Sequence, residues 1–247
     1  MTDRIRWVGH STVLVELDGV RLLTDPLLRE RVVMLRRTEP LDVNDLGDLD
    51  AVLVSHIHYD HLDIGSLRRL DEDPKIVLPR GASPLLRRRG FDSLTELEAG
   101  EETTVGALTV RAVHAEHDSA RLFGLKTNAL GYVISGSKRV YFLGDTGLFP
   151  AMAEIAPGTD VALVPIWGWG PSLGEGHLDP QSAAEAARLI SPTLAVPIHW
   201  GTYYQVSLRR SEREFLTAPP LEFAAATAEL APEVDVRVLP VGGSLEL

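Results

Sequence analysis

Residues 51–63, AVLVSHIHYDHLD, join a short apolar segment to a dense group of metal-capable side chains. The apolar residues 51–54 predict a buried strand, and the polar residues after them predict a loop at its carboxyl end. Open α/β proteins bind ligands beyond the carboxyl ends of strands, so this loop is the expected functional site. The four residues that can ligate a metal are His56, His58, Asp60 and His61.

The spacing of these four residues indicates two neighbouring ions. Alternate loop positions can turn His56 and His58 toward one ion, which leaves Asp60 and His61 to face a second. Neutral imidazole suits zinc and related divalent metals, and carboxylate adds charge and can bridge two ions. A solvated turn is the alternative, but it has no reason to concentrate three of the eight histidines of the chain at this spacing.

Length and composition indicate a globular protein without thiol chemistry. The 247 residues allow a sizeable core, and we expect a single domain over 1–247. The chain has no cysteine, so metal ligands must be histidine and carboxylate. We expect a cytoplasmic protein without stable membrane insertion, because no secretory signal and no membrane-spanning apolar run are present. A homo-oligomer is compatible with the sequence.

The net charge of the chain restricts its partners. A charge of −11, from 24 basic and 35 acidic residues, disfavours nonspecific binding to nucleic acid or to an anionic membrane. An anionic substrate remains compatible, because two bound divalent ions would invert the local field. We therefore expect a small-molecule or lipid-like ester as the substrate and no nucleic acid partner.

Other histidines and one aspartate follow further predicted strands. They are His114 and His117 after a strand at 108–113, Asp145 after one at 139–143, and His199 after one at 194–198. Glycines on both sides of Asp145 let the backbone approach closely at a strand end, which suits a carboxylate that bridges two metals. Alone, this Gly-Asp-Thr-Gly turn would be an ordinary strand-to-helix connection, and the histidine-rich loop upstream favours the metal site. Only one of His114 and His117 is expected to close the first site.

Three features near the N-terminus have two interpretations each. Asp25, before Pro26, is either a turn residue or an outer carboxylate that orients a ligating histidine. His10 follows Gly9 at a predicted strand bend and is either near the metal site or structural. The mixed segment 28–44 either forms one wall of a substrate pocket or packs on the core.

The loop 166–176 and the residue after it add candidates on the same rim. Trp167 and Trp169 either stack on a substrate or pack on the core. Asp179 and Pro180 predict the start of a helix, as N-cap and first helical residue. His177 therefore lies in a loop immediately before a helix.

The pattern His-x-His-x-Asp-His after an apolar strand resembles the signature of the metallo-β-lactamase-fold hydrolases. The wider chain is similar to one branch of that family, which contains the N-acyl-phosphatidylethanolamine-hydrolysing phospholipase D and the ascorbate-phosphate lactonase-like proteins. The segments that carry the similarity, in the order of the family, are 7–26, 51–63, 112–117, 142–147, 177–180 and 197–203. The resemblance implies an α/β fold of four layers, the αββα sandwich, whereas periodicity alone predicts only mixed α and β.

The resemblance also implies a set of ligands. On this reading one ion is bound by three histidines, a second by one aspartate and two histidines, and an aspartate bridges both: His56, His58 and His117; Asp60, His61 and His199; and Asp145. The family pattern V-x-x-V-P-A-x-H aligns with V-R-A-V-H-A-E-H from Val110, which favours His117 as the ligand and leaves His114 as an outer or pocket residue. The resemblance implies that Asp25 accepts a hydrogen bond from a ligand and that His177 acts in the site without binding metal.

The expected reaction is hydrolysis by a hydroxide that bridges two divalent ions and attacks an ester phosphorus or carbonyl. We predict a metal-dependent hydrolase of a phosphodiester or ester-type bond, related to phosphodiesterases or phospholipase D. A lactonase acting on a small sugar-like lactone is the alternative. Asp60 is expected to orient the nucleophile, and His177 to donate a proton to the leaving group or to stabilise the oxyanion.

Zinc is favoured over iron, and manganese is the second candidate. In the oxygen-reducing di-iron members of this fold the second motif position is Glu, whereas here it is His58. Ligand type alone does not select zinc over manganese. A di-iron redox protein would need an electron donor, for which the chain offers no flavin-binding segment and no cysteine. A noncatalytic metal-binding module would not need His177.

Overall fold

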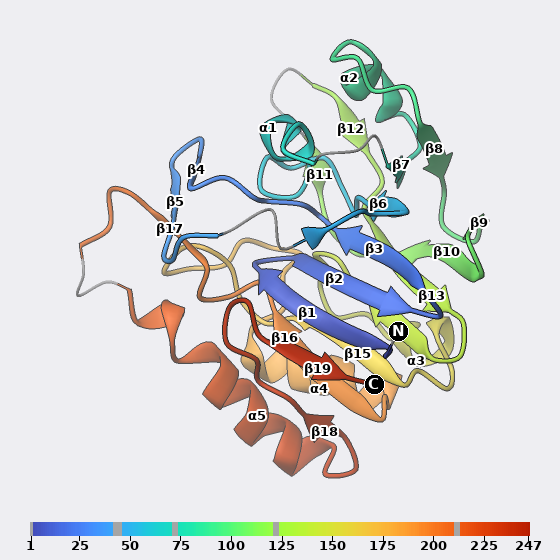
Figure 1. Cartoon of the computed structure of the whole chain (residues 1–247). Helices are drawn as coiled ribbons and strands as arrows, with labels where there is room; N and C mark the ends of the chain where they lie inside the picture. The colour runs from blue at the N-terminus through green and yellow to red at the C-terminus, as the bar shows by residue number, and fades with distance from the viewer. Residues whose placement is uncertain (1, 42–45, 71–73, 121–123, 210–212) are drawn as a thin grey trace.

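The structure is a computed structural model of the chain, and it describes residues 2–41, 46–70, 74–120, 124–209 and 213–247. Its centre consists of two seven-stranded mixed sheets. Figure 1 shows two short helices above the strands and two longer helices below them. They are α1 (Ile64–Leu67) and α2 (Ser83–Arg87), and α4 (Pro180–Ile190) and α5 (Pro219–Leu230).

The first sheet combines an antiparallel meander with parallel strands. Its strands are β1 (Arg4–Gly9), β2 (Thr12–Leu17), β3 (Val20–Thr24), β6 (Ala51–Leu53), β7 (Lys75–Pro79), β8 (Leu94–Leu97) and β19 (Ser244–Glu246), in the order β19-β1-β2-β3-β6-β7-β8. Strands β1 to β3 are antiparallel, and β3, β6, β7 and β8 are parallel. Asp18 and Gly19 join β2 to β3 with φ of 51° and 78°, the backbone that a two-residue type I′ turn requires.

The second sheet has the same mixed character. Its strands are β9 (Glu102–Val105), β10 (Leu108–His114), β13 (Leu130–Ser135), β14 (Arg139–Phe142), β15 (Val161–Pro165), β16 (Leu194–Ile198) and β18 (Asp235–Val236), in the order β18-β16-β15-β14-β13-β10-β9. Strands β9, β10, β13 and β14 are antiparallel, and β14, β15, β16 and β18 are parallel.

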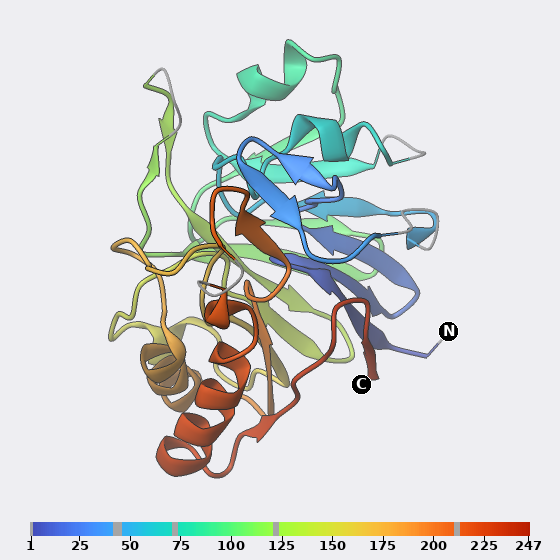
Figure 2. The same ribbon diagram turned by 90° about the vertical axis from the view of Figure 1, so that its left-hand side faces the viewer.

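Three apolar clusters separate four layers. One lies between the two sheets and includes Trp7, Tyr132 and Phe142. A second packs α3 (Met152–Ile155), α4 and α5 on the outer face of the second sheet, and a third packs α1 and α2 on the outer face of the first. In Figure 2 the red helix α5 lies beside α4 on one side of the strands, and the teal helices lie on the other. This arrangement confirms the predicted αββα sandwich.

A small sheet extends from the sandwich at the level of the histidine-rich loop. It consists of β4 (Arg31–Val32), β5 (Leu35–Arg37) and β17 (Tyr203–Gln205), which lie side by side in Figure 1. Val32 and Leu35 are buried in a cluster with Leu27, whereas Val33 and Met34 are exposed at the turn. The segment 28–44 therefore contains both core residues and exposed apolar residues, and its residues 42–45 lie outside the described part of the chain. A separate pair is formed by β11 (Ser119–Ala120) and β12 (Lys126–Thr127), and a 3-10 helix covers Glu214–Leu216.

Strands that run in the same direction bring the candidate residues to one edge of the sandwich. Within the first sheet β1, β3 and β6 run in one direction, and within the second sheet β10, β14, β15 and β16 do. The carboxyl ends of these strands carry the loops in which the sequence predicts a metal site. Within the described residues, no helix has the length and apolarity that a bilayer crossing requires.

Candidate metal centre

The candidate residues come from both sheets and meet at their shared edge. The first sheet contributes His10 after β1, Asp25 after β3 and the loop from His56 to His61 after β6. The second contributes His117 after β10, Asp145 after β14 and His199 after β16. The side chains form groups whose potential ligand atoms lie within 4.8 Å of one another.

Three imidazoles form the first group. Nδ1 of His58 lies 3.0 Å from Nε2 of His56 and 3.1 Å from Nε2 of His117. Burial lowers the pKa of all three rings, most strongly that of His56, which has no exposed surface. The rings are therefore neutral near pH 7, which is the form that binds metal ions.

Two imidazoles face Asp145 in the second group. Nε2 of His61 lies 3.1 Å from Oδ2 of Asp145, and Nε2 of His199 lies 3.2 Å from Oδ1. Burial lowers the pKa of His199 to about 3. Burial also opposes a charge on His61, but the carboxylates of Asp145, Asp60 and Asp25 outweigh it and raise the pKa of His61 well above its usual value. The second group therefore attracts positive charge.

His117, His199 and Asp145 offer protonless donor atoms to a cation. Nδ1–H of His117 donates to the carbonyl of Gly176 (2.9 Å), and Nδ1–H of His199 donates to that of Trp167 (2.6 Å). A neutral imidazole has a single N–H, so the Nε2 atoms of these two rings present lone pairs to the centre. Oδ1 of Asp145 is buried and accepts no hydrogen bond. Lone pairs and a carboxylate that converge without protons are the ligands of zinc and similar metals.

A buried hydrogen-bond network links the residues that follow strands β3 and β6. Oδ2 of Asp25 accepts hydrogen bonds from Nδ1–H of His61 (2.7 Å) and from the Ser55 hydroxyl (2.5 Å), and its Oδ1 accepts from the Ser55 amide (2.7 Å). These bonds fix the His61 ring with Nε2 toward Asp145. The sequence predicted that Asp25 accepts a hydrogen bond from a candidate ligand, and His61 donates such a bond. The Ser55 hydroxyl also lies 2.9 Å from Nδ1 of His56. Ser55 was not among the predicted site residues, and its position between the strand and the histidine motif was the only sequence signal for it.

Asp60 is held by two donors that sequence reasoning did not assign to it. Its Oδ2 lies 3.1 Å from Nε2 of His10 and accepts a hydrogen bond from the Trp169 indole N–H (3.0 Å). His10 is almost fully buried, has a left-handed φ of 55°, and its ring lies 4.0 Å from that of His199. The structure therefore places His10 beside the metal-capable group, which is one of the two interpretations of this residue.

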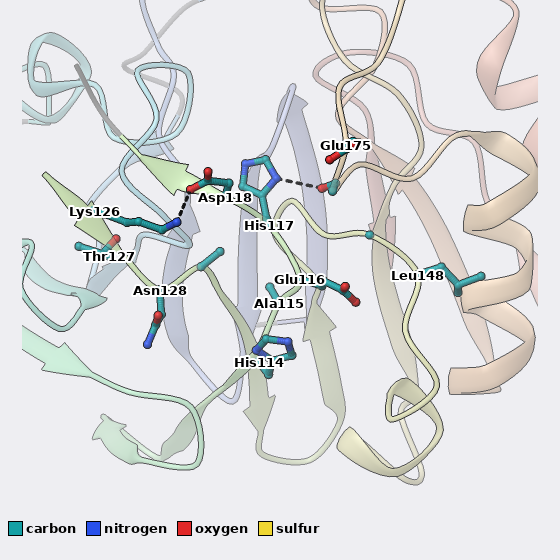
Figure 3. A pocket seen from close by; sticks show the side chains of 13 residues that line it. His114, Ala115, Glu116, His117, Asp118, Lys126, Thr127, Asn128, Leu148 and Glu175 are labelled. Carbon is teal, nitrogen blue, oxygen red and sulfur yellow. Dashed lines mark hydrogen bonds and ion pairs between the residues drawn. The ribbon is translucent and has the colours of Figure 1, made fainter. Parts of the chain in front are cut away.

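His114 and His177 lie at the periphery of the centre. His114 is exposed and packs its ring against Phe149. It also lines a neighbouring cavity with His117 (Figure 3). His177 precedes α4, whose predicted N-cap Asp179 accepts a hydrogen bond from the Ser182 amide. Nε2 of His177 lies 3.5 Å from Oδ2 of Asp145. Burial opposes its charge, but the hydrogen bond and charge of Asp145 outweigh this and raise the pKa of His177.

A cavity of about 330 Å³ opens above the candidate ligands. Metal-capable side chains form one side of it, namely His58, Asp60, Asp145 and His177. The other side is mostly apolar and consists of residues 32–35 of the β4–β5 hairpin with Tyr59, Trp169 and Gln205. Of the two tryptophans considered from the sequence, Trp169 lines this cavity, whereas Trp167 donates its N–H to the carbonyl of Gly170. The arrangement can hold a small molecule against the metal-capable groups.

The four-layer fold and the paired histidine–aspartate groups define a class of protein. The domain model of the beta-lactamase superfamily matches residues 20–200, and the chain belongs to this superfamily. More narrowly, the chain is 31% identical to a UPF0173 metal-dependent hydrolase of Methanopyrus kandleri, in an alignment that covers 98% of this chain and 99% of that protein.

Two further comparisons extend the relationship. The chain is 32% identical to N-acyl-phosphatidylethanolamine-hydrolyzing phospholipase D 1 of Caenorhabditis elegans, over 80% of this chain and 63% of that protein. It therefore spans less than two thirds of the phospholipase. The solved structure of Igni18, a metallo hydrolase of Ignicoccus hospitalis, is similar with a TM-score of 0.75 and 26% identity, over 100% of this chain and 99% of that one.

Proposed function

We propose that this protein is a hydrolase that binds two divalent ions and cleaves a phosphodiester or carboxylic-ester bond. The observation that carries the proposal is the convergence of Nε2 lone pairs beside Oδ1 of Asp145, which accepts no hydrogen bond from the described residues. Membership of the beta-lactamase superfamily and similarity to proteins named as metal-dependent hydrolases support it. A lactone, as an uncharged cyclic ester, is the second candidate, because no Lys or Arg is among the described residues that line the cavity.

Seven residues would hold the ions in this proposal. His56, His58 and His117 form one site, Asp60, His61 and His199 form the other, and Asp145 belongs to both. When bound, the ions supply Lewis acidity that lowers the pKa of a water molecule and offsets negative charge in the transition state. Histidine and carboxylate without thiolate suit zinc, and manganese is the alternative.

Two residues would act on the substrate and the attacking water. Asp60 has Oδ2 fixed by His10 and Trp169, so its carboxylate is oriented in advance for a water at the cavity floor. His177 donates Nδ1–H to the carbonyl of Gly174 (3.1 Å) and directs Nε2 toward Asp145 and the cavity. From that position Nε2 can pass a proton to the leaving group or hydrogen-bond the oxyanion.

The test combines metal analysis with hydrolysis. Protein loaded with zinc or manganese is analysed for bound metal and assayed with bis(p-nitrophenyl) phosphate, p-nitrophenyl acetate and a simple lactone. We expect about two ions per chain and turnover of at least one substrate. Asp60→Asn serves as the inactive control, and Asp50→Asn, which changes an exposed aspartate, serves as the active one. Full activity in metal-free protein would refute the proposal.

A further inference from the structure

The β4–β5 hairpin exposes apolar side chains at the mouth of the cavity. Val33 is 75% exposed and Met34 is 62% exposed, whereas their neighbours Val32 and Leu35 are 1% and 7% exposed. All four residues line the cavity. The hairpin thus anchors itself through Val32 and Leu35 and presents Val33 and Met34 to solvent beside the candidate metal centre. Large apolar side chains this exposed mark a surface at which something binds when they adjoin a site.

The turn of this hairpin is strained at Val33. Strands β4 and β5 pair Val32 with Leu35, so Val33 and Met34 form a two-residue turn. Val33 has a φ of 50°, in the left-handed region that disfavours β-branched residues. Glycine is the usual residue where the first position of such a turn has positive φ. Backbone strain of this kind concentrates at ligand-binding positions, so the Val33 side chain is a candidate contact for a bound molecule.

The hairpin is fixed relative to the candidate ligands. Strand β5 pairs with β17, which follows His199 by a few residues, and the amide of Val206 donates to the carbonyl of Met34 (3.0 Å). The buried guanidinium of Arg37 donates to the carbonyl of Leu27 (3.2 Å). These bonds tie β5 and the turn to β17 and to the segment after β3, so the apolar face of the hairpin is already in place before a ligand arrives.

The chemistry of the cavity indicates the class of molecule that it takes. Its wall offers apolar contacts from Val33, Met34 and Trp169, while the metal-capable groups lie on the opposite side. Tyr59 and Gln205 are uncharged and add polar atoms to the wall. Among the described lining residues no Lys or Arg is present to hold a second anionic group. A volume of about 330 Å³ is at the small end of the range of roughly 300–1,000 Å³ for ligand sites. A short apolar chain fits this space, and a charged headgroup has no partner on the wall.

We propose that the substrate is a small ester with a short alkyl or aryl group next to the scissile bond, and that this group binds on Val33, Met34 and Trp169. The proposal rests on the proposed function, because it names the substrate class of the same site. It makes Val33 and Met34 specificity-determining residues, with no part in the chemical step.

Binding of alkylphosphonates tests the proposal independently of catalysis. Methyl-, butyl- and hexylphosphonate share one anionic group and differ only in chain length. Calorimetric titration of the zinc-loaded protein should give a Kd that falls about two- to fourfold per methylene, as expected for half to full burial of each CH₂. The double variant Val33→Asn, Met34→Ser should lose most of this dependence but keep the affinity for methylphosphonate. Asparagine tolerates a positive φ, so the variant should fold normally, which thermal unfolding checks.

The control variant is Leu221→Ser, which removes another exposed apolar residue, 70% exposed on α5. Its phosphonate Kd should keep the full dependence on chain length. A Kd that is equal for all three phosphonates in the unmodified protein would overturn the proposal, as would an unchanged dependence in the double variant. Sedimentation identifies one cause of either result. If the double variant sediments with a smaller mass than the unmodified protein, the hairpin tip is a contact between copies of the chain.

Hydrolysis of methyl, butyl and hexyl acetate, none of which carries an aryl group, separates this inference from the proposed function. Turnover that is equal for the three esters leaves the hydrolase intact and overturns the substrate class. Absence of turnover for every ester and diester, together with phosphonate affinity that rises with chain length, refutes the hydrolase and supports an apolar binding site.

Discussion

Asp25→Asn is the substitution that most directly tests how the second group of ligands is oriented. Asp25 has no exposed surface and accepts three hydrogen bonds, from Nδ1–H of His61 and from the amide and hydroxyl of Ser55. Asparagine keeps one oxygen and replaces the other by NH₂, which can only donate. If the NH₂ faces His61, its Nδ1 must become the acceptor, and the proton moves to Nε2, the atom that faces Asp145.

The magnitude follows from these contacts. A hydrogen bond to a charged group contributes about 1.5–3 kcal/mol, and at least one of the three is lost. For a chain of this size each kcal/mol lowers Tm by about 2–4 °C, so the metal-free variant should melt roughly 3–12 °C lower. Loss of a residue that orients a histidine ligand costs about 10–100-fold in metal affinity.

Two assays check this prediction. Differential scanning calorimetry gives the Tm of the metal-free protein, and competition with a chromophoric chelator gives its zinc affinity. The matched control is Asp50→Asn, because Asp50 also accepts a backbone amide, that of Arg21 (2.8 Å), but at an exposed position. Unchanged zinc affinity in Asp25→Asn would refute the reasoning that the His61 tautomer controls binding.

Three further predictions concern other parts of the centre. His117→Ala should lose more bound metal than His114→Ala, because only the His117 ring reaches His58 (3.1 Å); metal analysis of both variants decides, and the opposite order would reverse the assignment. Trp169→Phe should keep its metal but lower kcat roughly tenfold or more through the lost hydrogen bond to Asp60, whereas Trp167→Phe, which loses a bond to a backbone carbonyl, should not; equal kcat in both variants would contradict this. The metal-free protein should lose stability as pH falls from about 6.5 toward 3. Burial lowers the pKa of His199 to about 3, and the pKa values of the three rings of the first group also lie below their usual value. The unfolded chain therefore binds more protons in this window. The raised pKa values of His61 and His177 act mainly above pH 6.5, because below that pH both residues are protonated in the folded and the unfolded chain. Denaturant titrations at several pH values measure the trend, and a rise in stability on acidification would contradict it.

The sequence predicted the fold through local patterns. The apolar strand and histidine loop at 51–63 and the Asp179 cap each depend on neighbouring residues, and the structure contains both. The resemblance supplied the layer order, which periodicity did not. The metal ligands themselves remain a prediction, although the candidate side chains do converge at one edge of the sandwich.

What the sequence left open depends on contacts between distant segments. His10 and Asp60 are 50 positions apart, and Trp169 and Asp60 are 109 apart, so no local pattern links them. The segment 28–44 had two interpretations because its apolar residues occupy successive positions, and only the pairing of β4 with β5 shows that Val32 is buried and Val33 is exposed at the turn. Ser55 escaped notice because a serine after a strand is common and its partner Asp25 lies 30 residues earlier.

The division of the centre between two sheets has a consequence for biosynthesis. Ribosomes release a chain from its N-terminus, so the loop from His56 to His61 emerges long before His199 completes the set. The first sheet must also wait, because β1 pairs with residues 244–246. A nascent chain therefore offers only a fragment of the donor set, and high-affinity metal capture becomes a late step that follows the docking of the two halves.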